Sequence, residues 1–271
     1  MAPCRLPRVV PGQASRAETW RDYHSRVSDL VTRFRTARTD PALAVLEGFH
    51  AIKHAIRFGA AIELVATRDI AVLQSLAMRL ASDVTPVLDE LVTTVTRAMF
   101  DQLAPTPPET GVIAIARRRL TTVAEVTRIA NAAPVVLLES PSHSGNIGAS
   151  IRVAAGAGAA AVLTTGPIDP WNPGALRGSA GLHYAVPVVR TETAESAGRL
   201  IIAVDPKGED FVPGCIPDNA LLAFGSERSG LSAGLLSGAH RRIRIPMQPG
   251  VSSLNLATAV AVMLYGWRLA R

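Results

Sequence analysis

Apolar and polar positions in the first half of the chain alternate between two spacings. Runs rich in β-branched residues predict strands, and segments with apolar residues three or four apart predict helices. The predicted strands are 42–48, 61–67, 84–89 and 111–118, and the predicted helices are 49–59, 72–81 and 90–100. Gly59 fits a helix end, and the Pro-rich segment 104–111 fits a loop. The pattern predicts a small α/β domain over residues 41–118.

The second half repeats the alternation with more apolar strands. The expected strands are 135–139, 160–165, 185–189, 200–204, 221–225 and 242–246, and the expected helices begin near residue 148, precede residue 200 and cover 254–269. Apolar strands alternating with helices predict a parallel sheet that carries helices on both faces. We expect residues 132–271 to form this second α/β domain, which a linker joins to the first.

Residues 1–40 are expected to differ from both domains. Residues 1–16 contain three prolines and no periodicity, which predicts a loose tail. Apolar residues with helical spacing then predict a helix from Glu18 to Arg38, with five arginines around it. A solvated basic face is favoured over a dedicated RNA groove for this helix.

Charge and cysteine content narrow the possible partners. The 271 residues carry a formal charge of +6, which favours a polyanion, although only two of the cations are lysines and a coding bias toward arginine gives the same excess. Aromatic residues make up 4%, so base stacking is not expected to dominate binding. Two cysteines form neither a disulfide framework nor a four-cysteine metal site. No apolar run predicts a membrane span, so we expect a cytoplasmic protein.

Three glycine-containing segments carry candidate chemistry. In 146–152 (NIGASIR), Asn146 and Arg152 flank the predicted start of a helix, which suits a phosphate, although a helix cap and a surface charge are the plain alternative. The segments 225–230 (GSERSG) and 245–255 (IPMQPGVSSLN) each follow a predicted strand. The G-x-G-x-x-A pattern at 156–161 precedes a strand instead of following one, which argues against a nucleotide-dependent oxidoreductase.

In this order and spacing the three segments resemble the signature motifs of the SPOUT superfamily, TrmH/SpoU type. The resemblance implies a methyltransferase that moves a methyl group from S-adenosylmethionine to a ribose 2′-hydroxyl of RNA. It is specific over 135–271 and weaker over 43–116, where Glu47–Gly48 and Gly111–Val112 match an RNA substrate-binding domain.

The resemblance also implies roles for individual residues. The implied catalytic residues are Asn146, Arg152, Glu227, Ser253 and Asn255; the cofactor-binding residues are Val204, Gly225, Ile245, Met247 and Leu254; and the RNA-binding residues are Arg152, Arg177 and Ser179. No metal is implied. Because guanidinium stays protonated, we expect Arg152 to hold a phosphate and stabilise a developing alkoxide instead of acting as a base. Ser252 stands where many relatives have an acid.

The resemblance further implies a deep trefoil knot, which ordinary connection rules do not predict, and a homodimer. Ribosomal RNA is the expected substrate, and transfer RNA is the alternative. A knotted RNA-binding protein without catalysis is the rival interpretation. The presence of all five implied catalytic residues argues against it.

Overall fold

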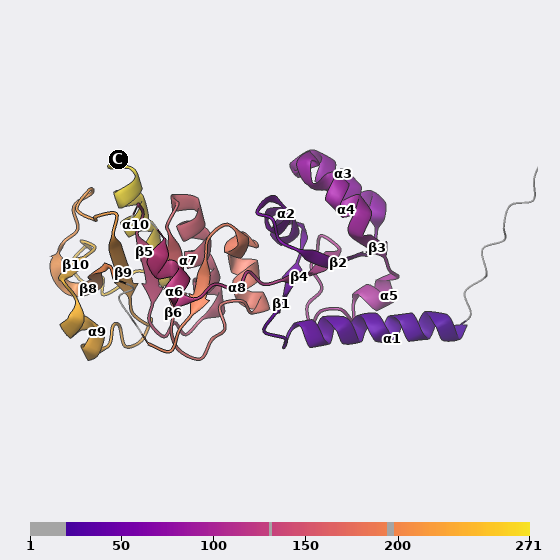
Figure 1. Ribbon diagram of the computed structural model, residues 1–271, viewed down its shortest axis with the longest axis horizontal. Helices are drawn as coiled ribbons and strands as arrows, with labels where there is room; N and C mark the ends of the chain where they lie inside the picture. The colour runs from indigo at the N-terminus through magenta and orange to yellow at the C-terminus, as the bar shows by residue number, and fades with distance from the viewer. Residues whose placement is uncertain (1–19, 130–131, 194–197) are drawn as a thin grey trace, which may run out of the picture.

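The computed structural model describes residues 20–129, 132–193 and 198–271, and it contains two β-sheets that lie side by side (Figure 1). The first helix, α1 (Trp20–Ala37), packs along the N-terminal sheet through Phe34 and Ala37, both buried. The loose tail expected for residues 1–16 lies outside the described residues. No described helix is long and apolar enough to cross a membrane.

The N-terminal sheet has four strands in the order β1-β4-β2-β3. Its strands are β1 (Leu43–Glu47), β2 (Ile62–Thr67), β3 (Val92–Thr94) and β4 (Val112–Arg117). Its helical segments are α2 (Phe49–Arg57), α3 (Ile70–Leu80), η1 (Ser82–Val84), α4 (Thr85–Leu91) and α5 (Arg97–Phe100). Strand β4 is antiparallel to β1 and β2, whereas β3 is parallel to β2.

Two element predictions in this region are wrong. Segment 84–89 is helical instead of extended, because Pro86 stands in the first turn of α4, where its missing N–H breaks no helical hydrogen bond. Segment 90–100 is not one helix: it contains the end of α4, strand β3 and the short α5. The β-branched run 92–94 favours a strand, and β2 offers it a partner.

The C-terminal sheet has six strands in the order β10-β8-β9-β5-β6-β7, and every pair is parallel. Its strands are β5 (Val135–Leu138), β6 (Ala161–Thr164), β7 (Val188–Arg190), β8 (Leu200–Asp210), β9 (Ala220–Phe224) and β10 (Arg241–Arg244). Its helical segments are α6 (Val123–Arg128), α7 (Ser144–Ala157), α8 (Pro173–Gly178), η2 (Leu182–Tyr184), α9 (Ala233–Gly238) and α10 (Leu256–Arg268). The predicted parallel α/β sheet is confirmed.

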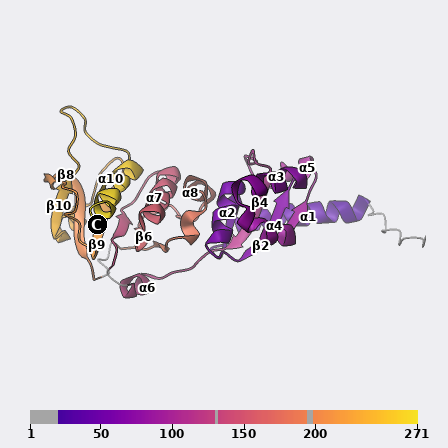
Figure 2. The same ribbon diagram turned by 90° about the horizontal axis from the view of Figure 1, so that it is seen from above.

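Alternate residues of these strands enter two different cores, as expected for a sheet covered on both faces. Val136 and Leu138 of β5 pack in the core that contains α7, α8 and α10. Val135 and Leu137 face the opposite core, which contains residues of α6 and α9. The views of Figure 1 and Figure 2 both draw α7 and α10 side by side on one face.

Helix α7 begins four residues before the predicted start, at Ser144, so that Asn146 lies in its first turn. It ends at Gly158 in a left-handed conformation with φ of 75°, which glycine adopts without the steric cost of a Cβ. Helix α6 in the expected linker has a capping box between Thr122 and Glu125.

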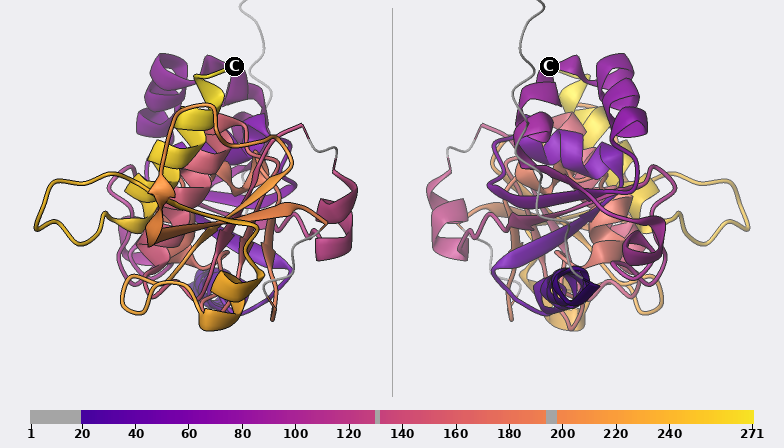
Figure 3. Two further views of the ribbon diagram at one scale, coloured as in Figure 1. Left: turned by 90° about the vertical axis from the view of Figure 1, so that its left-hand side faces the viewer. Right: turned by 90° about the vertical axis from the view of Figure 1, so that its right-hand side faces the viewer.

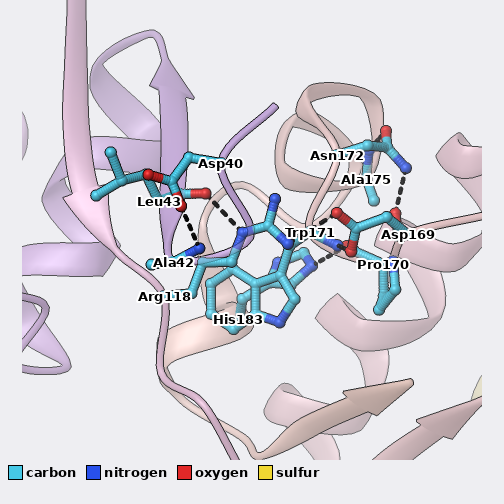
Figure 4. A network of polar contacts seen from close by, with 10 residues as sticks. All are labelled: Asp40, Ala42, Leu43, Arg118, Asp169, Pro170, Trp171, Asn172, Ala175 and His183. Carbon is cyan, nitrogen blue, oxygen red and sulfur yellow. Dashed lines mark hydrogen bonds and ion pairs between the residues drawn. The ribbon is translucent and has the colours of Figure 1, made fainter. Parts of the chain in front are cut away.

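The two sheets are joined by a buried polar junction (Figure 4). Arg118, which follows β4, donates from Nη1 to Oδ2 of Asp169 at 2.7 Å and from Nε to the carbonyl of Leu43 at 2.5 Å. The imidazole of His183 is fully buried and lies 2.7 Å from the carbonyl of Pro170. A Cβ on Gly181 would lie 2.3 Å from the carbonyl oxygen of Ala51 in α2, so the two parts of the chain meet at backbone distance.

Candidate active site

A pocket of about 780 Å³ opens at the carboxyl ends of β8, β9 and β10. Open α/β sheets bind ligands at this edge. The five predicted cofactor-binding residues, Val204, Gly225, Ile245, Met247 and Leu254, all line it. Three of the predicted catalytic residues, Glu227, Ser253 and Asn255, line it as well. The structure therefore brings eight residues from three distant segments into one cavity.

Glycine at position 225 is required by the shape of the loop after β9. A Cβ there would lie 2.0 Å from the carbonyl carbon of Gly230 and 2.2 Å from the amide of Leu231. The loop folds back on itself, and Ser226 and Gly230 exchange backbone hydrogen bonds of 3.1 and 3.0 Å. This tight return places Glu227 at the pocket wall.

The opposite wall is the long connection between β10 and α10, which reaches out from the sheet in Figures 2 and 3. Its residues 248–255 are exposed. Within this segment the amide of Val251 donates to the carbonyl of Gln248 and closes a turn. Half of Val251 and 38% of Leu254 are exposed. Apolar side chains on this connection are thus available to a ligand.

Side-chain hydrogen bonds connect all three motifs at the edge of the pocket. Asn146 donates from Nδ2 to Oε1 of Glu227 at 2.6 Å, and its Oδ1 accepts from Nδ2 of Asn255 at 3.0 Å. The second carboxylate oxygen of Glu227 accepts from the amide and hydroxyl of Ser142 at 2.9 and 2.6 Å. We call Ser142, Asn146, Glu227 and Asn255 the motif network.

Glu227 is held in its ionised form. Burial raises the pKa of its carboxyl, but the hydrogen bonds from Ser142 and Asn146 outweigh that effect and lower the pKa to about 2. A carboxylate of such low basicity is a poor proton acceptor at neutral pH. Its hydrogen bonds suit it to orient Asn146 instead.

Asn255 has a double function in the fold. Its Oδ1 caps α10 by accepting from the amides of Ala257 and Thr258, at 3.0 and 3.4 Å. The cap fixes the amide group, so that Nδ2 is free to donate to Asn146.

Gly148, in the same motif as Asn146, permits the packing of α7 on α8, since a Cβ there would lie 2.2 Å from the carbonyl oxygen of Ala175.

Arg152 lies outside both the pocket lining and the motif network. Its side chain is exposed on α7, two turns after Asn146. Burial, together with the charges of Lys53 and Arg152, lowers the pKa of His50 on α2. The guanidinium is therefore close to a basic group on the N-terminal part of the chain.

Arg177 and Ser179 belong to the junction. Arg177 forms an ion pair with Glu47, whose carboxylate also accepts from Nη2 of Arg38 at 3.1 Å. Ser179 is fully buried, and its Oγ lies 2.7 Å from Nδ1 of His183. This burial gives Ser179 a structural function in place of the predicted RNA contact.

Two parts of the site were missed by sequence reasoning. Ser142 completes the motif network, but it lies before the segment 146–152 in which the sequence was searched for candidate residues. Residues 205–207 line the pocket although the expected strand ended at Val204. Among the described residues no group of three or more histidine, cysteine, aspartate or glutamate side chains is placed to hold a metal ion.

Comparisons with known proteins agree with these motifs. Residues 133–265 match the model of the SpoU rRNA Methylase family. An uncharacterized tRNA/rRNA methyltransferase of Mycobacterium bovis is 36% identical over 169 residues, covering 57% of this chain and 58% of the relative. The 23S rRNA (guanosine(2553)-2′-O)-methyltransferase RlmP of Bacillus subtilis is 32% identical over 149 residues, covering 52% of this chain and 60% of RlmP. The chain thus spans less than two thirds of either relative.

A solved structure shares the fold over most of the chain. The SpoU methyltransferase AviRb of Streptomyces viridochromogenes, in complex with AdoMet, superposes with a TM-score of 0.69 at 22% identity, covering 89% of this chain and 96% of AviRb. The likeness extends across both sheets, well beyond the segment that the family model matches.

Proposed function

We propose that this chain transfers a methyl group from S-adenosylmethionine to a ribose 2′-hydroxyl of RNA, because residues 133–265 match the model of the SpoU rRNA Methylase family. The observation that carries the proposal is the motif network at the rim of the pocket, where Asn146, Glu227 and Asn255 are hydrogen-bonded to one another. These residues come from three separate motifs; Glu227 and Asn255 line the pocket, and Asn146 is hydrogen-bonded to both.

The pocket fits S-adenosylmethionine in size and lining. Gly225, Ile245, Met247 and Leu254 offer backbone and apolar surface for an adenosine. When bound, the cofactor supplies an electrophilic methyl group. AviRb, which has the same fold, was solved in complex with AdoMet.

The chain's own residues orient the reacting hydroxyl and balance its charge. The Glu227 carboxylate and the Asn255 amide fix the side chain of Asn146 beside the pocket. Glu227 stays ionised and is too weak a base to take the proton. Arg152 stabilises the developing alkoxide and holds an RNA phosphate, whose oxygen takes the proton.

The RNA surface extends onto the N-terminal sheet in this proposal. Arg152 lies near His50 and Lys53 of α2, so that one basic surface includes both parts of the chain. Residues 41–118 then form the RNA substrate-binding domain and residues 132–271 the catalytic domain. Ribosomal RNA is the proposed substrate, as it is of RlmP by its name, and transfer RNA is the alternative.

A trefoil knot and a homodimer complete the proposal. The connection from β10 to α10 encloses one side of the pocket, as expected of a chain end that passes through a knot. Tyr265 on α10 and Leu269 directly after it expose apolar surface, with 40% and 81% of the residue accessible respectively, which suits a second copy of the chain. An RNA substrate and the free thiol of Cys215 fit a cytoplasmic setting.

Calorimetry with S-adenosylhomocysteine tests the cofactor, and Arg152→Ala tests the chemistry. We expect the wild-type protein to bind the ligand without metal. The variant should bind it within a few-fold of wild type while methyl transfer falls by orders of magnitude, because Arg152 lies outside the pocket lining. Loss of both properties together would contradict the function given to Arg152. RNA binding without any transfer by the wild-type protein would favour the non-catalytic alternative.

RNA affinity should depend steeply on salt, because arginines supply nearly all the cations and aromatic residues are few. About four to eight phosphate contacts give a slope of about −3 to −7 for log K against log salt, at ~0.7–0.9 per contact. Titration of a folded ribosomal RNA fragment and its scrambled strand at several salt concentrations measures this slope. A flat response, or equal affinity for both strands, would oppose recognition by phosphates and RNA shape.

A further inference from the structure

An irregularity in β8 forms a wall of the pocket that no motif describes. The parallel pairing of β10 with β8 runs from Arg242 opposite Ala203 directly to Ile243 opposite Glu209. Residues 204–208 therefore form a bulge that has no partners in β10, although Val204 still pairs with Phe224 of β9. Four of them, from Val204 to Lys207, line the pocket.

Backbone contacts fix the shape of this bulge. A Cβ on Gly208 would lie 2.5 Å from the carbonyl carbon of Arg242 and from the amide nitrogen of Ile243, so glycine alone fits there. The amide of Lys207 donates to Oδ1 of Asp205 at 2.9 Å, and Pro206 fixes its own φ between them. The side chain of Lys207 thus starts from a defined point on the pocket wall.

The charges of the pocket are unevenly paired. Asp205, Lys207, Glu227, Arg228 and Arg244 line it. Asp205 accepts the Lys207 amide, Glu227 belongs to the motif network, and Arg244 pairs with Asp210 at 2.6 Å. Within the described part of the chain, the ammonium of Lys207 and the guanidinium of Arg228 have no hydrogen-bond or ion-pair partner.

Strand order separates these two free cations. Arg228 follows Glu227 on the loop after β9, beside β5 and the start of α7, where Asn146 lies. Lys207 lies on β8, on the other side of β9 from β5. Arg228 is therefore on the side of the reacting centre, and Lys207 is on the side away from it.

We propose that Lys207 binds the carboxylate of the amino-acid part of the cofactor. The inference rests on the proposed function and adds a residue that selects the amino-acid part of the ligand. S-Adenosylmethionine carries one carboxylate, and an otherwise unpaired ammonium on a rigid wall is a suitable partner for it. The ammonium also distinguishes the full cofactor from an adenosine thioether that lacks the amino acid.

Two ligands separate this contact from the rest of the pocket. S-Adenosylhomocysteine contains the carboxylate, whereas 5′-methylthioadenosine has the same adenosine and sulfur without the amino-acid group. We expect Lys207→Met to weaken binding of the first by about tenfold to a hundredfold, the range of a hydrogen bond to a charged group, and to change binding of the second by less than about twofold. Calorimetry on the full-length protein measures both affinities.

Arg228→Met is the matched control, since it removes the other free cation of the pocket and should leave both affinities within about twofold of wild type. Lys207→Arg should restore part of the preference for S-adenosylhomocysteine. An equal loss of both ligands in Lys207→Met would mean that Lys207 only shapes the bulge, and a selective loss in Arg228→Met alone would assign the carboxylate to Arg228. Either of these last two results overturns the inference. A wild-type protein that binds neither ligand would remove the proposed cofactor itself, and the inference with it.

Discussion

The polar residues of the junction and those of the pocket differ in how far the protein satisfies them. At the junction, His183 and Ser179 are fully buried and bonded to each other, and the Arg118 guanidinium is bonded to Asp169 and Leu43. At the pocket, the motif network is largely exposed, and Lys207 and Arg228 lack partners among the described residues. Buried and satisfied groups hold a structure together, whereas exposed and unsatisfied groups are available to a ligand.

The contrast applies to two sequence patterns that looked equally functional. Arg177, Ser179 and Gly181 matched a family segment, as did Asn146 and Arg152. The structure ties the first set to Glu47, His183 and the backbone of α2, and it leaves Asn146 beside an open pocket. Motif matching alone did not separate residues that join the two sheets from residues beside the pocket.

The largest expected effect is on catalysis, at the pocket. Asn146→Ala removes the link between Glu227 and Asn255 and should lower the methyl-transfer rate by about 100- to 1000-fold, in the range of one lost transition-state donor. The free energy of unfolding should change by less than about 1 kcal/mol, because the side chain is only partly buried. Single-turnover kinetics and urea denaturation measure the two quantities. A large loss of stability would mean that Asn146 holds the structure together, as the buried residues of the junction do.

The opposite outcome is expected at the junction. Arg118→Met removes the donor to the Leu43 carbonyl and to Oδ2 of Asp169, a carboxylate that is 38% exposed and still accepts from the Trp171 amide, and should lower the free energy of unfolding by about 1.5–3 kcal/mol. Arg117→Met is the matched control. The side chain of Arg117 is 64% exposed and forms an ion pair with Glu63 at the surface, and the loss of such a pair should lower the free energy of unfolding by less than about 1 kcal/mol. Similar losses in the two variants would mean that burial does not distinguish these arginines.

The pH dependence of stability should also come mainly from the junction. Burial, partly opposed by the hydrogen bond to Pro170, lowers the pKa of His183 from 6.5 to about 4. A histidine with a depressed folded-state pKa contributes stability that is present above pH 6.5 and is lost as the pH falls toward 4. The loss should reach about 3 kcal/mol, from a shift of this size at 1.36 kcal/mol for each pKa unit.

His183→Gln should flatten that part of the stability profile. Denaturant unfolding from pH 7 to pH 4 compares the variant with the wild type. The pKa of the Glu227 carboxyl is about 2 in the folded protein. Its contribution to the free energy of unfolding is therefore lost only as the pH falls from about 4.5 to about 2. It should amount to less than about 1 kcal/mol, because solvent screens this exposed group. An unchanged slope between pH 6.5 and pH 4 in the variant would contradict the burial account of His183.

The smallest expected effect distinguishes two glycines of α7. Gly148→Ala places a Cβ against the Ala175 carbonyl and should cost about 2 kcal/mol of stability, the cost of an overpacked core. Gly145→Ala in the first turn of the same helix meets nothing within 4 Å and should change the stability by less than about 0.5 kcal/mol. Thermal unfolding of both variants decides whether the glycine of the N-x-G pattern serves packing.

The sequence predicted the C-terminal fold well because its central strands, β5, β6 and β9, are apolar on both faces. It misassigned 84–100, where Pro86 stands in the first turn of a helix and not inside a strand, and where a short parallel strand depends on β2 for its partner. Pairing between strands that are distant in sequence is a tertiary interaction, so a local sequence pattern does not predict it.

The sequence likewise predicted some residues of the candidate site and missed others. Pocket residues in the motifs, such as Gly225 and Leu254, were predicted by resemblance, and the structure brings them together. Lys207 was missed because its place depends on a bulge that arises from the register between β8 and β10. Ser179 was assigned to RNA because sequence contains no direct measure of its burial.

The most direct test is transfer of labelled methyl from S-adenosylmethionine to an unmodified ribosomal RNA transcript, followed by digestion to nucleosides. The account predicts that the wild-type protein places the label on the ribose 2′-oxygen of a defined nucleotide, and that Asn146→Ala, folded and still able to bind S-adenosylhomocysteine, places almost none. Label on a base, or equal transfer by the wild type and Asn146→Ala, would contradict the claim that the motif network is the reacting centre.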